Sequence, residues 1–212
     1  MPTGGIGAAP SLQGTAGNSA AVLCDIARAG PELARRVAEV PGALAALVDA
    51  VAAGSDAAEP ELQRLAINST EVLANIAWAD SELALRVAEK PGTLPALVAA
   101  MAAGGAAAAP KLQDAAAHSA RVLANIVRCS RERVRQVAEV PGVLATLVAT
   151  VAAGGAAAAP SLQYAAADSA VVLLHIASTG PKLARRVAEV PSALPTLVGA
   201  VAAGGATATP RL

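Results

Sequence analysis

The stretch ELALRVAEKPGTLPALVAAM (residues 82–101), followed after a linker by KLQDAAAHSARVLANIVRCS (residues 111–130), decides the fold of this chain. Pro91-Gly92 predicts a turn, because proline cannot continue the helix before it. Leu83 and Val87 lie four residues apart on a short helix before that turn. Four apolar residues after the turn follow the helical spacing i, i+3, i+4, i+7; they are Leu94, Leu97, Val98 and Met101.

The same signals delimit three helices in each copy of this pattern. In the second copy, a long helix is predicted from Pro60 to about Ala79, because proline at the first helical position has no hydrogen bond to lose. A short helix is expected from Ser81 to about Lys90, and a third from about Thr93 to Ala103. Valine and isoleucine recur at helical spacing rather than in alternation, so no strand is predicted.

The pattern recurs every 50 residues along the whole chain. Prolines mark the period; they are Pro10, Pro60, Pro110, Pro160 and Pro210. No single copy could bury its apolar faces alone, so stacking of one copy on the next must supply the missing partner. The period therefore predicts an all-α stack of helix triplets with a continuous core.

In this order, the motifs resemble the armadillo repeat. The matching residues are Pro91-Gly92, Leu94, Leu97-Val98, Leu112-Gln113 and Leu123-Ala124-Asn125-Ile126. The resemblance implies a right-handed α-solenoid, an armadillo-like superhelix, of about four three-helix repeats. It makes residues 1–212 one array, with partial units at 1–30 and 181–212 and repeat boundaries near 31–80, 81–130 and 131–180. The period of 50 is longer than the 40–47 residues typical of the family.

Five positions of the long helix vary in chemistry from copy to copy while their neighbours hardly change. We call them the variable stripe, because they follow one another at i, i+4, i+7, i+11 and i+14 on one helix face. In the first copy they are Gly14, Asn18, Ala21, Asp25 and Arg28. In the later copies the candidate binding residues are Arg64, Asn68, Glu71, Asn75 and Trp78; Asp114, His118, Arg121, Asn125 and Arg128; and Tyr164, Asp168 and His175.

The resemblance implies that this stripe lies on the concave inner surface, where the family's long helices line a groove. We therefore expect an exposed stripe that binds an extended peptide or a protein partner. Asparagine can donate and accept hydrogen bonds at once, which suits a main-chain amide. Tryptophan and arginine are enriched in binding hot spots, which favours Trp78 with Arg28 and Arg128. The alternative is a solvated face that drifted after duplication.

Two other roles stay open. The chain could be a structural spacer within a larger assembly. An importin-type transport adaptor is disfavoured, because the Trp that peptide-binding members carry one turn before the Asn is replaced here by Ala21, Glu71, Arg121 and Val171.

Composition argues against several other classes. Sixteen basic residues balance sixteen acidic ones, and aromatic residues make up 1% of the chain, so nucleic-acid binding is not expected. No metal-binding motif, signal peptide or membrane span is recognisable, and two cysteines do not make a disulfide framework. We expect a non-enzymatic protein without cofactor or metal, located inside the cell in the cytoplasm or nucleus.

Other recurring residues are interpreted as structural. Ser19, Ser69, Ser119, Ser169 and Cys24 are expected on the packed side, and Glu39 and Glu139 to pair with Arg35 and Arg135 four residues earlier. The first and last copies are partial and complementary. This favours a piece of a longer array, or head-to-tail self-association.

Overall fold

A proline or a polar cap begins most helices of this chain, and in the first three triplets a turn with glycine separates the second helix from the third. The computed structural model describes residues 10–55 and 57–206, which form twelve α-helices and no strand. The predicted all-α class is thereby confirmed. Residues 1–9 and 207–212 of the two predicted partial units lie outside the described residues.

The helices form four triplets, each with a long, a short and a third helix in chain order. The long helices are α1 (Pro10–Arg28), α4 (Pro60–Ala79), α7 (Pro110–Cys129) and α10 (Pro160–Ser178). The short helices are α2 (Pro31–Glu39), α5 (Ser81–Glu89), α8 (Arg131–Glu139) and α11 (Pro181–Ala188). The third helices are α3 (Ala43–Gly54), α6 (Thr93–Ala103), α9 (Val143–Ala153) and α12 (Ala193–Ala206).

The turn before each third helix depends on a left-handed backbone. Gly42, Gly92 and Gly142 have φ between 78° and 82°, a region that glycine adopts without steric cost. Ser192 stands at this position in the last triplet and is held at φ 61°. The last turn is therefore the strained member of the set.

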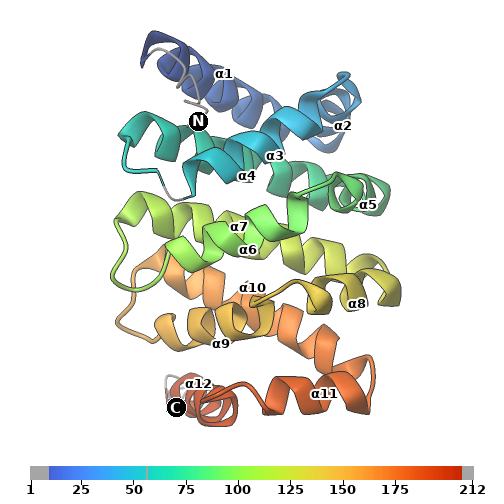
Figure 1. Cartoon of the computed structure of the whole chain (residues 1–212), viewed down its shortest axis with the longest axis vertical. Coiled ribbons are helices and arrows are strands. Elements are labelled where there is room, and N and C mark those ends of the chain that lie inside the picture. The colour runs from blue at the N-terminus through green and yellow to red at the C-terminus, as the bar shows by residue number, and fades with distance from the viewer. Residues whose placement is uncertain (1–9, 56, 207–212) are drawn as a thin grey trace, which may run out of the picture.

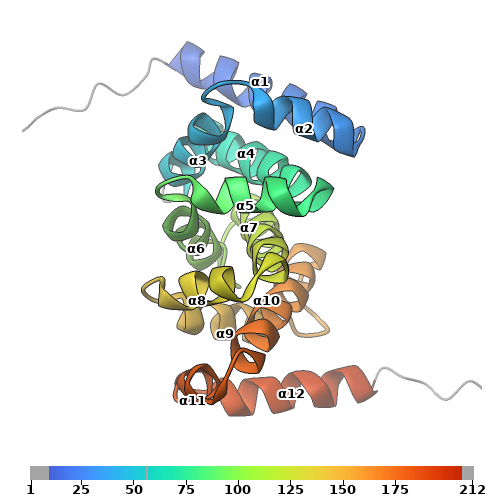
Figure 2. The same ribbon diagram turned by 90° about the vertical axis from the view of Figure 1, so that its right-hand side faces the viewer.

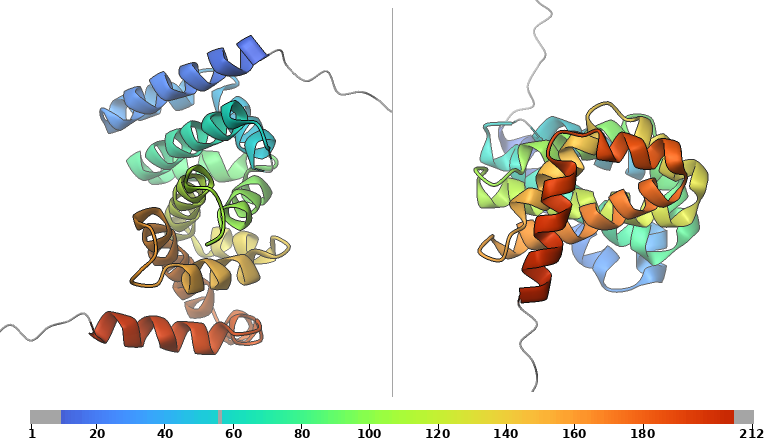
Figure 3. Two further views of the ribbon diagram at one scale, coloured as in Figure 1. Left: turned by 90° about the vertical axis from the view of Figure 1, so that its left-hand side faces the viewer. Right: turned by 90° about the horizontal axis from the view of Figure 1, so that it is seen from below.

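The four triplets follow one another along the long axis of the molecule, from α1 at one end to α11 and α12 at the other (Figures 1 and 2). Successive long helices pack on one another, and α3, α6 and α9 each pack on the long helix that follows in the chain. Seen from below, α12 lies across the end of the stack, with no helix between it and the viewer (Figure 3).

One continuous apolar core runs through these contacts. It includes fully buried side chains from three long helices; examples are Ile76, Ile126 and Ile176. Ser69, Ser119, Ser169 and Cys24 are buried as predicted. The same prediction is wrong for Ser19, which is exposed on the first long helix. The long helices thus present one face to this core and leave another for contacts that vary between copies.

The predicted pairs of glutamate and arginine within the short helices are wrong. Arg35 instead forms an ion pair with Asp80 of the next triplet. Arg135 lies 3.8 Å from Glu132, one turn earlier in α8. Arg35 pairs with a carboxylate of the stacked triplet, and sequence spacing within one helix does not contain that information.

Candidate functional site

The variable stripe divides into two parts with different surroundings. Its first part, in the N-terminal halves of the long helices, is engaged in contacts between neighbouring long helices. Asn68 donates a hydrogen bond from Nδ2 to the carbonyl oxygen of Gly17 (3.1 Å), and Asp114 accepts one from the hydroxyl of Ser161. Arg64 pairs with Glu61 one turn earlier in α4 (2.7 Å).

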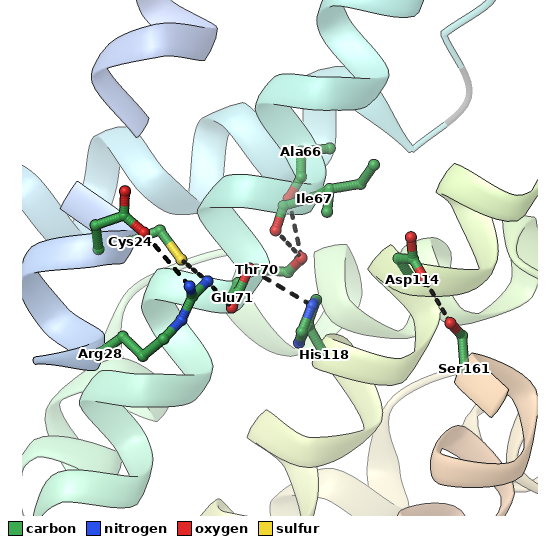
Figure 4. A network of polar contacts seen from close by, with 10 residues as sticks. Cys24, Arg28, Ala66, Ile67, Thr70, Glu71, Asp114, His118 and Ser161 are labelled. Atoms are coloured by element: carbon green, nitrogen blue, oxygen red, sulfur yellow. Dashed lines mark hydrogen bonds and ion pairs between the residues drawn. The ribbon is translucent and has the colours of Figure 1, made fainter. Parts of the chain in front are cut away.

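Glu71 is the centre of the polar contacts that link α1, α4 and α7 (Figure 4). Its Oε1 accepts a hydrogen bond from Arg28 Nη2 (2.5 Å), and its Oε2 lies 3.8 Å from His118 Nε2. Arg28 also contacts Asp25 and the Cys24 sulfur. The first three long helices are therefore joined by one half-buried carboxylate.

Burial and the polar contacts of this cluster act together on the pKa values of its members. Burial acts to raise the pKa of Glu71, but hydrogen bonds from Arg28 and Cys24 and the charge of His118 outweigh it, so the pKa is lowered. Burial also lowers the pKa of His118, against the attraction of Glu71. It raises the pKa of the Cys24 thiol to about 12, and Glu71 adds to that shift. Cys24 is therefore a protonated, unreactive thiol near neutral pH.

The second part of the stripe lines a groove of about 480 Å³ at the C-terminal ends of α1, α4 and α7. We call it the Trp78 groove. Six of its lining residues are candidate binding residues predicted from the sequence, namely Asn75, Trp78, Arg121, Asn125, Arg128 and Asp168. The others are Ala27, Arg28, Gly30, Pro31 and Ala79. The structure thus brings together side chains from four long helices that lie up to 141 positions apart in the sequence, counting from Ala27 to Asp168.

The groove has an exposed rim and a buried floor. Trp78 is 72% exposed, and Arg121 and Arg128 are exposed as well. Asn125 is only 7% exposed, so the prediction of an exposed stripe is wrong at this residue. Its helix α7 packs between the long helices α4 and α10.

The charges of the groove are unequal. Three arginines, Arg28, Arg121 and Arg128, line it with one carboxylate, that of Asp168. Arg121 Nε lies 4.0 Å from Asp168 Oδ2, and Arg128 donates a hydrogen bond to Asn125 Oδ1 (3.1 Å). Burial raises the pKa of Asp168, although Arg121 and Arg128 act in the opposite direction.

Seven predicted residues lie outside the groove. Asn68, Glu71, Asp114 and His118 make the contacts between long helices described above, and the remaining three are Arg64, Tyr164 and His175. Tyr164 is 62% exposed and His175 is half-buried, both on α10, and neither lines the Trp78 groove. Arg64 likewise lies outside it. Conversely, sequence reasoning missed Gly30 and Pro31, which enter the groove because the turn between α1 and α2 comes close to α4. No motif in the sequence marks that approach.

Within residues 10–55 and 57–206, no group of three or more His, Cys, Asp or Glu side chains is placed to hold a metal ion. In the same residues no single helix is long and apolar enough to cross a membrane, although three bent helix pairs pass that test by length and composition.

Comparisons with known proteins extend the description of the fold. No protein-family model matches the chain, and no curated protein matches it. A solved structure that does match is the crystal structure of an engineered protein from the Northeast Structural Genomics Consortium. It has 24% sequence identity and a TM-score of 0.66, over 92% of this chain and 69% of that one. This likeness concerns the fold alone.

Proposed function

We propose that the chain is an armadillo-like right-handed α-solenoid that acts as a non-catalytic scaffold and binds a peptide or protein partner in the Trp78 groove. One observation carries the proposal. Seven of the side chains that differ between copies meet in one groove, whereas most apolar side chains that pack the triplets together recur from copy to copy. Random sequence drift on a solvated face does not explain why these side chains gather in a groove.

The groove also has the polar and apolar groups that a partner needs. Trp78 presents a large ring to solvent, and such rings are enriched where proteins bind one another. The side-chain nitrogens of Asn75 and Asn125 are buried and have no hydrogen-bond partner among the described residues. A buried unpaired donor costs about 1–3 kcal/mol, and main-chain carbonyls of a bound peptide would offset that cost.

A structural spacer is the second candidate. Apolar side chains on α12 favour it, because Leu194, Val198 and Val201 are 58%, 69% and 77% exposed. Such a face supports stacking on a further copy or a neighbouring protein. An importin-type adaptor has less support, since the stripe position of Glu71 and Arg121 carries no tryptophan in any copy.

A selection experiment separates the two candidates. The chain is immobilised and random-sequence peptides displayed on phage are enriched on it, in parallel with the triple variant Asn75→Ala, Trp78→Ala, Asn125→Ala. We expect sequences that bind the native chain and fail to bind the triple variant. A control variant changes three exposed residues of the short helices, Glu32→Ala, Arg36→Ala and Glu82→Ala, and should retain binding.

Circular dichroism of both variants checks that they remain helical. Equal enrichment on the native chain and a folded triple variant contradicts binding in the groove and favours the spacer.

A further inference from the structure

We infer that the Trp78 groove recognises an extended peptide segment in which an acidic side chain lies next to an apolar one. This inference rests on the proposed function and names the chemistry of its partner. It follows from three separate features of the groove: an arginine without a carboxylate partner, a buried asparagine with an unused donor, and an exposed tryptophan.

Arg128 is the cation available for an incoming carboxylate. Among the described residues its hydrogen bond goes to the neutral Asn125 amide, and it forms no ion pair. By contrast, Arg28 is engaged with Glu71 at 2.5 Å. Arg121 is intermediate, because its contact with Asp168 is 4.0 Å long. A planar guanidinium with free N–H groups can bind a carboxylate with two parallel hydrogen bonds.

Asn125 is more than nine-tenths buried, and only the oxygen of its side-chain amide has a hydrogen-bond partner. Its Oδ1 accepts from Arg128, which fixes the orientation of the amide, while Nδ2 has no partner. Asn75, on the neighbouring helix α4, also has a buried and unpaired Nδ2. Both line the groove. They can donate to main-chain carbonyl groups of a segment that has no internal hydrogen bonds, which is an extended one.

Trp78 provides the apolar part of the site. It occupies in α4 the stripe position that Arg28 holds in α1 and Arg128 holds in α7. Because these helices are neighbours, the indole lies between two cationic positions. When a bound peptide places an apolar side chain over this ring, the preceding or the following residue of the peptide therefore lies within reach of Arg128.

The observations favour a peptide over a nucleic acid. The chain has no net charge, and Trp78 is its only tryptophan. Binding of a nucleic-acid strand uses several cations and several stacking rings along its length. One free arginine beside one ring fits a single carboxylate.

Trp78 makes the test direct, because its fluorescence reports on the groove alone. The titration uses a blocked pentapeptide Ser-Glu-Leu-Glu-Ser and its analogues with glutamine or lysine in place of both glutamates. We expect a saturable change in Trp78 emission with the acidic peptide, and affinity at least about tenfold weaker for both analogues, as for the loss of one charge-assisted hydrogen-bonded pair.

Variants assign the effect to named side chains. Arg128→Gln should weaken binding of the acidic peptide about tenfold, whereas Arg36→Gln, which changes an exposed arginine of α2, should leave it unchanged. Asp168→Asn should strengthen binding about threefold, because it removes the carboxylate that competes for Arg121 and repels the ligand. A misfolded variant would not bind more tightly, so this gain excludes damage to the fold as its cause.

Each other outcome overturns the inference. Equal affinity for the glutamine peptide, or tighter binding of the lysine peptide, would refute acidic recognition and leave peptide binding in place. No emission change with any peptide up to about 1 mM would refute this ligand class, and the display selection would decide separately whether the groove binds peptides. Tighter binding of a short oligothymidylate than of the acidic peptide would assign the groove to nucleic acid instead.

Discussion

Val72 in α4 and Val22 in α1 occupy the same position of the 50-residue repeat, yet Val72 is fully buried and Val22 is 58% exposed. The other end of the stack shows the same contrast, since Val148 in α9 is 3% exposed and Val198 in α12 is 69% exposed. The residues are identical and only their neighbours differ. Stacking of neighbouring triplets, rather than packing within one triplet, therefore supplies most of the burial.

The largest effect should come from shortening one core side chain at the two kinds of position. Ile126→Ala, in the interior helix α7, should lower the free energy of unfolding by about 3–4 kcal/mol, because Ile126 is fully buried. Ile26→Ala in α1 should cost about 1 kcal/mol, because Ile26 is 37% exposed. Urea unfolding followed by circular dichroism measures both, and equal losses would contradict the role assigned to stacking.

A glycine that recurs at positions 104 and 204 shows the same difference between the interior and the end of the stack. A Cβ at Gly104 would lie 2.4 Å from the carbonyl oxygen of Leu112 and 2.4 Å from the Ala116 Cβ, where α6 meets the next long helix. At Gly204, the same position of the last triplet, a Cβ would meet nothing within 4 Å.

We therefore expect Gly104→Ala to destabilise the protein by about 2–3 kcal/mol through overpacking against backbone. Gly204→Ala should cause no loss. Thermal unfolding of the two single variants, made in the same background, tests this directly; a Gly104→Ala protein as stable as the native one would show that α6 and α7 do not approach so closely.

A smaller effect is expected from pH at the polar junction between α4 and α7. Burial lowers the pKa of His118 below its ordinary value of 6.5, so the unfolded chain takes up this proton at a higher pH than the folded one. Stability from this group is therefore complete above about pH 6.5 and falls as the pH is lowered through that value.

His118→Gln should reduce the difference in melting temperature between pH 7.5 and pH 5.5. The Glu71 carboxylate contributes in the same direction at lower pH, because its pKa is lowered in the fold. Glu71 therefore remains as a source of acid sensitivity in the variant. If the native protein is as stable at pH 5.5 as at pH 7.5, His118 is not held in its neutral form.

The smallest effect concerns the turn of the last triplet. Ser192 adopts φ 61°, where the other three triplets have glycine. Ser192→Gly should raise stability by about 0.5–1 kcal/mol through release of this strain, partly offset by the greater freedom of glycine in the unfolded chain. Gly92→Ser should have the opposite sign. Equal melting temperatures for Ser192→Gly and Gly92→Ser would contradict this reading.

The fold was largely predictable because proline and glycine mark its boundaries. The long helix expected from Pro60 to about Ala79 and the third helix expected from Thr93 to Ala103 have those bounds in the structure. The short helix ends at Glu89, one residue before the expected Lys90. A period shared by four copies also revealed which faces are buried, as the serines at 69, 119 and 169 confirm.

The candidate site was predictable only in outline. A stripe on one helix gives the order of its residues but not their distance from the next helix. The pairing of Arg28 with Glu71 and the burial of Asn125 depend on that distance. For the same reason, the sequence predicts that the third helix ends at Ala103 but does not predict the close approach of α7 to the next residue, Gly104.

Binding in the Trp78 groove can be observed at the side-chain amide resonances of Asn75 and Asn125. Two-dimensional NMR spectra are recorded with and without a peptide selected on the native chain. Binding in the Trp78 groove predicts that both resonances shift on saturation, since their unpaired nitrogens gain acceptors. The Asn68 amide, already bonded to Gly17, should not move. Shifts confined to α12, with those of Asn75 and Asn125 unchanged, would contradict the account.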